Sequence, residues 1–266
     1  MRRHIVFFGI LLLYGNFLPG YPQVTAASTE TSDLLIASGD SLMLFENFSG
    51  AQKEFIKALE LAESIKDERK ALAILNRLGR SAIELNDSTK ARRYLRHAKR
   101  IAGQYPNAAP ERAGTLATWG LYYNQFGPDS LAASYFERSL DILQTCCAEE
   151  HGMLGSVCLD YAKFWSRIKN PSAEEMAIRS TEYLRQVSGV SRIKLADAYN
   201  LCGSMVRERG ETELRNHYVN GAAQILSVFP KAPPNLAIQI YANLAAQKVD
   251  ADQFQDAVII YRNIKN

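Results

Sequence analysis

Apolar and small residues recur along the chain at spacings of three and four, which place them on one face of an α-helix. The clearest unit covers residues 72–102, where two such stretches are separated by Asn86-Asp87-Ser88. Asn, Asp and Ser favour helix ends, because their side chains accept hydrogen bonds from the free amides at a helix start. The pattern therefore predicts two amphipathic helices joined by a tight turn.

The second helix of this unit carries a small, a large and a small residue, and this triplet recurs six times. Successive triplets begin 40 to 43 residues apart, a period of about 41. The triplets are Ala51/Phe55/Ala58, Ala91/Leu95/Ala98, Ala132/Phe136/Ser139, Ala173/Ala177/Ser180, Leu214/Tyr218/Gly221 and Ala257/Tyr261/Ile264. Twelve positions before each triplet stand, in turn, Gly39, Gly79, Gly120, Tyr161, Cys202 and Ala245. This regularity predicts helical repeats stacked as one α-solenoid.

Residues 33–266 resemble the tetratricopeptide repeat (TPR) family. The family pattern is Trp or Leu, Leu, Gly and Tyr on the first helix and Ala, Phe and Ala on the second. It is followed most closely by Leu116, Trp119, Gly120, Tyr123, Ala132, Phe136 and Ser139. The usual TPR period is 34 residues, so the longer period here is similar to that of elongated TPR-like subfamilies. The resemblance implies an all-α, right-handed solenoid of about six helix-turn-helix repeats.

Residues 1–27 differ from the repeats and predict a secretory signal peptide. Arg2 and Arg3 precede an apolar run over residues 5–18, and small residues near Ala26 and Ala27 offer a cleavage site. The alternative is an uncleaved N-terminal anchor, although the run is short for a membrane span of roughly 20 residues. We expect a signal peptide over 1–27 and a solenoid over 28–266, exported to the bacterial periplasm or cell envelope.

The TPR resemblance implies that the first helices of the repeats line a concave face that binds an extended peptide or a helix. Its ligand-reading positions, carried over residue by residue, are Asn76, Arg80, Leu121, Asn124, Gln125, Trp165, Tyr199 and Arg207. Asn and Gln can pair with a peptide backbone. Trp and Tyr supply contact area, and Arg recognises carboxylates. The alternative for Trp165 and Tyr199 is packing between neighbouring first helices.

Charge and motifs narrow the range of functions. The net charge is only +3, so nucleic acid is not the expected partner. The sequence has no Gly-rich phosphate loop, no Gly-x-Ser-x-Gly and no Cys/His cluster at metal-ligand spacing. We therefore expect no catalytic residue, no metal and no cofactor. Cys158 and Cys202 are interpreted as small apolar helix residues, the alternative being a disulfide from Cys146 or Cys147 to Cys158.

One stretch is strongly basic. Residues 52–112 contain 14 Lys and Arg against 8 Asp and Glu, with the excess centred on residues 90–100. Ala91, Leu95 and Ala98 take the buried face there, so the cations are expected outside. Two explanations stay open, a solvated helix face and attraction to an acidic envelope surface or acidic peptide.

The last predicted helix carries more apolar side chains than one neighbouring helix can cover. They are Phe254, Ala257, Val258, Ile259, Ile260, Tyr261 and Ile264. Because a terminal repeat normally presents a polar outer face, we expect self-association or docking of another protein around Ile260.

These observations favour an exported, non-catalytic TPR-like scaffold that binds a protein or peptide partner on its concave face. The alternative is a truncated extracytoplasmic sensor region of a membrane signalling protein, either a histidine kinase or a transcriptional regulator. An enzyme built on a helical array is disfavoured by the missing catalytic constellation.

Overall fold

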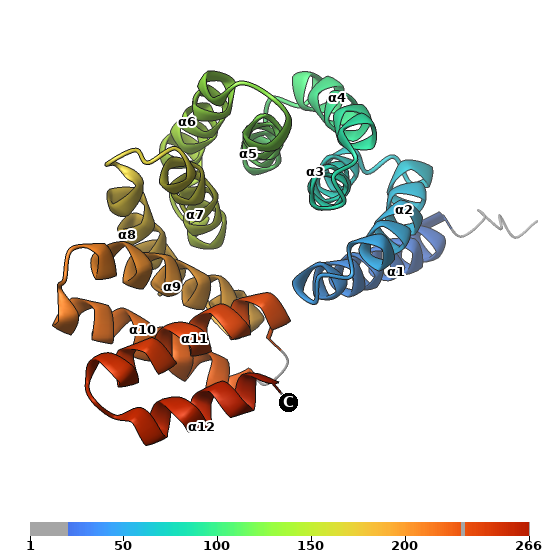
Figure 1. The fold of residues 1–266 in the computed structure, drawn as a ribbon. Coiled ribbons are helices and arrows are strands. Elements are labelled where there is room, and N and C mark those ends of the chain that lie inside the picture. The colour runs from blue at the N-terminus through green and yellow to red at the C-terminus, as the bar shows by residue number, and fades with distance from the viewer. Residues whose placement is uncertain (1–20, 230–231, 266) are drawn as a thin grey trace, which may run out of the picture.

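A computed structural model describes residues 21–229 and 232–265, which form twelve α-helices, one short 3-10 helix and no strand. The helices follow one another as six pairs (Figure 1). The pairs are α1 (Tyr21–Leu44) with α2 (Phe48–Ser64), α3 (Glu68–Glu84) with α4 (Ser88–Gln104), α5 (Ala109–Phe126) with α6 (Asp129–Cys146), α7 (His151–Arg167) with α8 (Ala173–Leu184), α9 (Arg192–Glu208) with α10 (Thr212–Val228), and α11 (Pro234–Asp250) with α12 (Phe254–Lys265). The prediction of an all-α solenoid of six helix pairs is confirmed.

The first helix begins at Tyr21, earlier than the predicted repeat start at Asp33. The intervening stretch contains no glycine, and its one proline, Pro22, lies in the first turn, where a missing N–H costs no helical hydrogen bond. Residues 1–20 lie outside the described residues, so the signal peptide and its cleavage stay predictions. Among the described helices, none is both long enough and apolar enough to cross a lipid bilayer.

The turn between α3 and α4 shows how the pairs are connected. Asn86 has φ 58°, a left-handed conformation that Asn tolerates better than most residues. Asp87 then caps α4 by accepting a hydrogen bond from the Lys90 amide at 2.9 Å. Glu46 and Asn47 repeat this geometry between α1 and α2. The predicted role of the polar segment, to end one helix and cap the next, is confirmed.

Close approach within a pair depends on a small residue facing a large one. In three pairs a Cβ added to the first-helix glycine would come within 3 Å of a second-helix side chain. These are Gly39 with Phe55, Gly79 with Leu95, and Gly120 with Phe136. In α7/α8 the roles are exchanged, because Tyr161 supplies the large ring and Ala177 the small partner, both buried. The combined size of the two side chains is therefore maintained, while either helix can carry the larger one.

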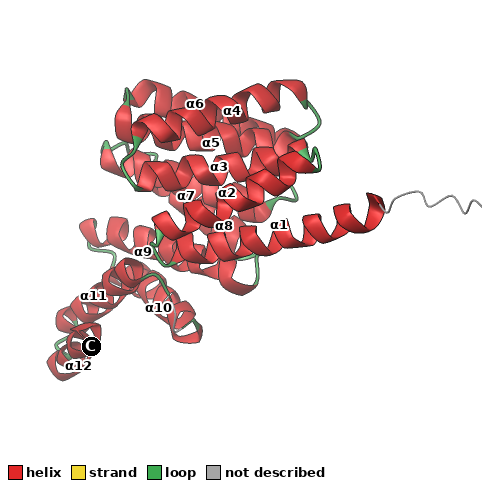
Figure 2. Cartoon of the chain, turned by 90° about the vertical axis from the view of Figure 1, so that its right-hand side faces the viewer, coloured by secondary structure: helices red, strands yellow, loops and turns green. Residues whose placement is uncertain are grey.

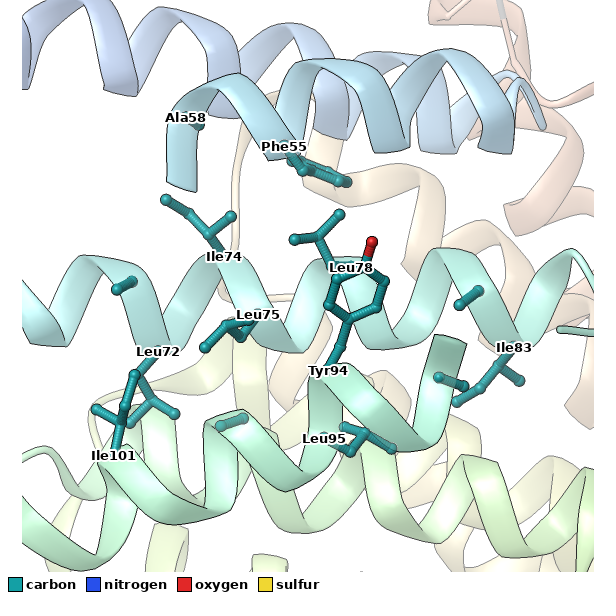
Figure 3. Close-up of a cluster of buried hydrophobic side chains, with 14 of the residues drawn as sticks. Phe55, Ala58, Leu72, Ile74, Leu75, Leu78, Ile83, Tyr94, Leu95 and Ile101 are labelled. Atoms are coloured by element: carbon teal, nitrogen blue, oxygen red, sulfur yellow. The ribbon is translucent and has the colours of Figure 1, made fainter. Parts of the chain in front are cut away.

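The large residues at these contacts belong to hydrophobic clusters that extend over several helix pairs. Figure 3 shows Leu75 and Leu78 of α3 between Phe55 of α2 and Leu95 of α4, all four fully buried. Further clusters extend from α5 to α10 and from α7 to α11. Burial of one leucine contributes about 1.5–3 kcal/mol, so apolar contact between successive pairs holds the array together.

The fifth pair departs from the predicted register by one residue. The sequence placed Leu214 on the buried face of α10, but this side chain is 36% exposed. The buried positions with the same spacing of four and three are Arg215, Val219 and Ala222. The repeat itself is intact and Tyr218 is buried as predicted, but the triplet begins at Arg215 rather than at Leu214.

Two contacts explain the corrected register. A Cβ on Gly203 would lie 3.2 Å from Val219, so Gly203 rather than Cys202 is the small residue opposite α10. Arg215 occupies a position that is small in other pairs, and its guanidinium forms an ion pair with Asp250 of α11. A charge is tolerated at such a buried position when its partner is in place. The pattern of small residues therefore does not indicate position 215.

The six pairs follow an arc in which α3, α5 and α7 lie on the inner side and α4, α6 and α8 on the outer side (Figure 1). The ends of the arc approach each other, and Asn235 at the start of α11 donates a hydrogen bond to Glu46 after α1. In Figure 2 the far end of α1 and the α11/α12 pair lie on opposite sides, so the arc is a superhelix. The first helices consequently face one another across the inside of the arc.

The four cysteines are free thiols. Cys158 and Cys202 are completely buried, and desolvation raises the pKa of each thiol to about 12. Their surroundings are those of apolar helix residues, as the sequence indicated.

Replacing Gly120 with Ala should lower the free energy of unfolding by about 1–3 kcal/mol, because the new methyl group overpacks the buried Phe136 ring. Gly103 provides a matched control in α4, since a Cβ there meets nothing within 4 Å. Gly103→Ala should be neutral or stabilising by up to about 1 kcal/mol. Urea unfolding followed by circular dichroism measures both effects. Equal stabilities of the two variants would contradict the packing role of Gly120.

Candidate functional site

Polar side chains on the inner side of the arc join the first helices of successive pairs. Arg77 of α3 forms two hydrogen bonds with Asp40 of α1, at 2.8 and 3.0 Å. Lys163 of α7 pairs with Asp197 of α9 at 2.5 Å. These partners are 37 and 34 residues apart, close to one repeat period. The stacking of similar units therefore brings polar groups together that are one repeat apart in sequence.

One ion pair spans two repeats. The terminal nitrogens of Arg80 in α3 donate to both carboxylate oxygens of Asp160 in α7, at 2.8 and 3.0 Å. The Asp160 side chain is 9% exposed and that of Arg80 38%. Attraction to the Asp160 carboxylate is the largest cause of the raised pKa of Arg80. Bidentate pairs of this kind are strong and directional, so this one ties α3 to α7 across the intervening α5.

Lys194 of α9 is a fourth cation in this region, and its ammonium has no carboxylate partner among the described residues. Its Nζ donates to the Ser156 hydroxyl of α7 at 2.8 Å. The side chain is exposed, yet protein surrounds it across the arc. Desolvation, followed by the positive charge of Arg80, lowers the pKa of Lys194, while Asp160 and Asp40 act in the opposite direction. Charges from α1, α3, α7 and α9 thus influence one another inside the arc.

The predicted binding residues Asn76 and Arg80 are already bonded within the chain. Asn76 donates to the Glu111 carbonyl and accepts a hydrogen bond from the Thr115 hydroxyl, both at 2.9 Å. Arg80 is held by Asp160. A ligand would compete with α5 for Asn76, whereas the exposed part of Arg80 remains accessible.

Asn124 and Gln125, near the end of α5, contact neighbouring repeats. Asn124 accepts a hydrogen bond from Nε of Arg167 at 2.8 Å, and Gln125 donates to the side-chain oxygen of Asn86 at 3.1 Å. Gln125 remains exposed. Leu121 instead packs against two hydrophobic clusters. This end of α5 therefore offers mainly polar contacts.

The two predicted aromatic residues lie in packed surroundings. The Trp165 ring is 3.9 Å from that of Tyr161, measured between centroids. Tyr199 accepts a hydrogen bond at 2.9 Å from Nε of Arg185, which follows α8. Arg207 is exposed and has no bonded partner in the described chain. The eight predicted residues thus come from four first helices, α3, α5, α7 and α9, and most of them are also bonded or packed within the chain.

The sequence missed Asn200, whose surroundings match those of Asn76. Asn200 donates to Gln239 at 3.4 Å and accepts a hydrogen bond from Asn243 at 2.7 Å, so it joins α9 to α11. The one-residue error in the fifth register led to the neighbouring Tyr199 instead.

Asp160 and Lys194 were missed for a different reason. Periodicity within one helix identifies a face but does not identify partners on helices that are one or two repeats away. The available signal was a pair of opposite charges about one period apart, such as Asp40 and Arg77.

Comparison with known proteins identifies the fold. No protein-family model matches the chain, and neither does any curated protein. The solved structures give a clear match. The chain shares its fold with BtubC (BKLC) from P. vanneervenii. The TM-score is 0.64 with 19% sequence identity, and the match covers 88% of this chain and 89% of the BtubC chain. At this identity, the similarity to BtubC shows the fold alone, a helical-repeat solenoid.

Replacing Arg80 with Ala should lower the free energy of unfolding by about 1–3 kcal/mol, because Asp160 then loses its charged partner. The value lies below that of a fully buried pair, since Arg80 is 38% exposed and solvent screens the interaction. Asp160→Ala should lower the free energy of unfolding less in the Arg80→Ala variant than in the wild type. The difference, which is the coupling energy of the pair, should be about 0.5–2 kcal/mol. Chemical denaturation of the double-mutant cycle measures this coupling. Arg207→Ala is the control, and strictly additive effects of the two substitutions would refute the bridge.

Proposed function

We propose that this protein is an exported, non-catalytic TPR-like scaffold whose inner face binds an extended segment of a partner protein. The repeat pattern resembling TPR proteins and the signal-like residues 1–27 support this proposal. The observation that carries it is the gathering of polar, partly exposed side chains from several first helices on the inside of the arc. Such groups can pair with the backbone and charges of an extended chain.

Lys194 is the best-placed contact for the ligand. Arg77, Arg80 and Lys163 already hold carboxylates, whereas Lys194 is bonded only to the neutral Ser156 hydroxyl. A ligand carboxylate or carbonyl can approach its ammonium without breaking an ion pair. The partial desolvation of Lys194 strengthens such a contact, because charges interact more strongly where less water surrounds them.

Peptides selected from a random display library on the purified protein provide the test. Lys194→Gln should weaken their binding at least tenfold, since a hydrogen bond to a charged group contributes roughly 1.5–3 kcal/mol. Arg262→Gln on α12 removes the same charge away from the inner face and should leave the Kd unchanged. Fluorescence anisotropy with labelled peptides measures both variants. If Lys194→Gln binds the peptides as tightly as the wild type, the inner-face proposal fails.

The last helix supports a second proposal, self-association around Ile260. Four large apolar side chains of α12 are 42–56% exposed, namely Phe254, Val258, Ile259 and Tyr261. The repeat pattern had placed Tyr261 on the buried face, but in the described chain no further pair packs against α12. The side chain of Ile264 lies outside the described residues. Phe254, Val258 and Tyr261 follow one another at spacings of four and three, so they share one side of α12. In a two-fold dimer such a face packs against its own copy.

Size-exclusion chromatography with light scattering should show a dimer that Val258→Glu converts to a monomer. Val258 is a better position to change than Ile260, because Ile260 is half-buried and its replacement would also disturb packing. Leu34→Glu in α1 is the matched control, since Leu34 is also an exposed apolar residue, at 67%. A monomeric wild type, or equal dimerisation of both variants, would contradict this role of α12.

A further inference from the structure

Helix α4 presents a row of cations on the outer side of the arc. Its 17 residues contain no Asp or Glu. Its six basic residues are all exposed, namely Lys90, Arg92, Arg93, Arg96, Lys99 and Arg100. The opposite face is fixed in the core by Ala91, Tyr94, Leu95, Ala98 and Ile101. Packing therefore orients the whole basic face toward solvent.

Most of this charge is not neutralised within the described chain. Lys90 pairs with Asp87 at 3.1 Å, and it is the only α4 cation there with a carboxylate partner. Arg92 donates from Nε and Nη2 to the uncharged hydroxyl of Tyr122, at 2.9 and 2.6 Å. The other four form no ion pair with a described residue, and they are Arg93, Arg96, Lys99 and Arg100. The outer face of α4 thus keeps a local excess of five positive charges.

This arrangement opposes helix stability. Arg92, Arg96 and Arg100 succeed one another at intervals of four residues, and like charges at that spacing destabilise a helix. The other second helices of the described pairs avoid the problem, because α2, α6, α8, α10 and α12 each contain both acidic and basic residues. A solvated face needs no such excess, so the composition of α4 points to an external anionic partner.

We propose that the outer face of α4 binds a phosphate-bearing lipid surface. Guanidinium groups match phosphate oxygens bidentately, and clusters of four to eight Lys and Arg on a helix are typical of contacts with anionic lipids. The face carries no exposed large apolar side chain over residues 88–104, although protein interfaces usually need such an anchor. Its place on the outside of the arc (Figure 1) leaves it open to a flat surface. This contact is independent of peptide binding on the inner face.

The test compares four forms of the full chain, namely the wild type and three triple variants. One variant combines Arg93→Gln, Arg96→Gln and Arg100→Gln, leaving Arg92 and its hydrogen bonds to Tyr122 in place.

A matched control removes the same three charges elsewhere through Lys169→Gln, Arg192→Gln and Arg262→Gln. These three residues are exposed and form no ion pair in the described chain. Both variants therefore have the same net charge, and only the place of the lost charges differs.

Sedimentation with phosphatidylcholine vesicles that contain about 30% phosphatidylglycerol measures binding. Wild type and control should bind alike, and the α4 variant about 100-fold more weakly, because each basic residue near an anionic membrane contributes about fivefold. Wild-type binding should also fall steeply as the salt concentration rises from about 0.05 to about 0.5 M. Purely neutral vesicles give the baseline. Residues 1–20 are identical in every form, so their contribution does not affect the comparison.

Replacing Arg93, Arg96 and Arg100 with Lys keeps the charge and should retain most of the binding, which separates charge loss from a folding defect. Equal binding by the α4 variant and the control would overturn the proposal. A wild type that binds an acidic peptide or a short RNA but not the anionic vesicles would overturn it as well.

Discussion

The close approach of the two helices in the first three pairs rests on matched sizes at one contact. If Gly79 carried a Cβ, that atom would lie 2.9 Å from the Leu95 side chain, so the helices could not keep their separation. In the fourth pair the large residue, Tyr161, is on the first helix and the small one, Ala177, on the second, and both are buried in one hydrophobic cluster. Selection can therefore act on the sum of two side chains, and single positions can drift while the spacing of the helices stays constant.

A buried hydrogen bond between the two helices of a pair can likewise be supplied by either helix. Ser139 of α6 donates to the Ala113 carbonyl of α5, and Ser180 of α8 donates to the Gly155 carbonyl of α7, both at 2.8 Å. In the first pair the donor lies on the other helix, where Ser32 of α1 bonds to the Ala58 carbonyl of α2. The buried hydroxyl needs a carbonyl partner, but either helix can supply it. Degenerate repeats can thus share a regular geometry.

The sequence allowed the helix pairs, their period and most of the core to be predicted, because these depend on local spacing of apolar residues. The predicted buried positions of the fifth pair were wrong by one residue, because the true position is Arg215. Its burial depends on Asp250 one repeat later. Asn76 and Arg80 were assigned correctly to a first helix, but their partners on α5 and α7 depend on the curvature of the stack. Curvature accumulates from small rotations between repeats, and no single helix encodes it.

The bridge between Arg80 and Asp160 also changes how the array can open. In a simple solenoid each unit touches only its nearest neighbours, so terminal units fray independently. Here the second and fourth units are joined directly, and Asn235 joins the last unit to Glu46 in the first. Unfolding of one repeat therefore also disturbs contacts between repeats that are not its neighbours. We therefore expect the array to unfold more cooperatively than a solenoid in which only adjacent repeats touch.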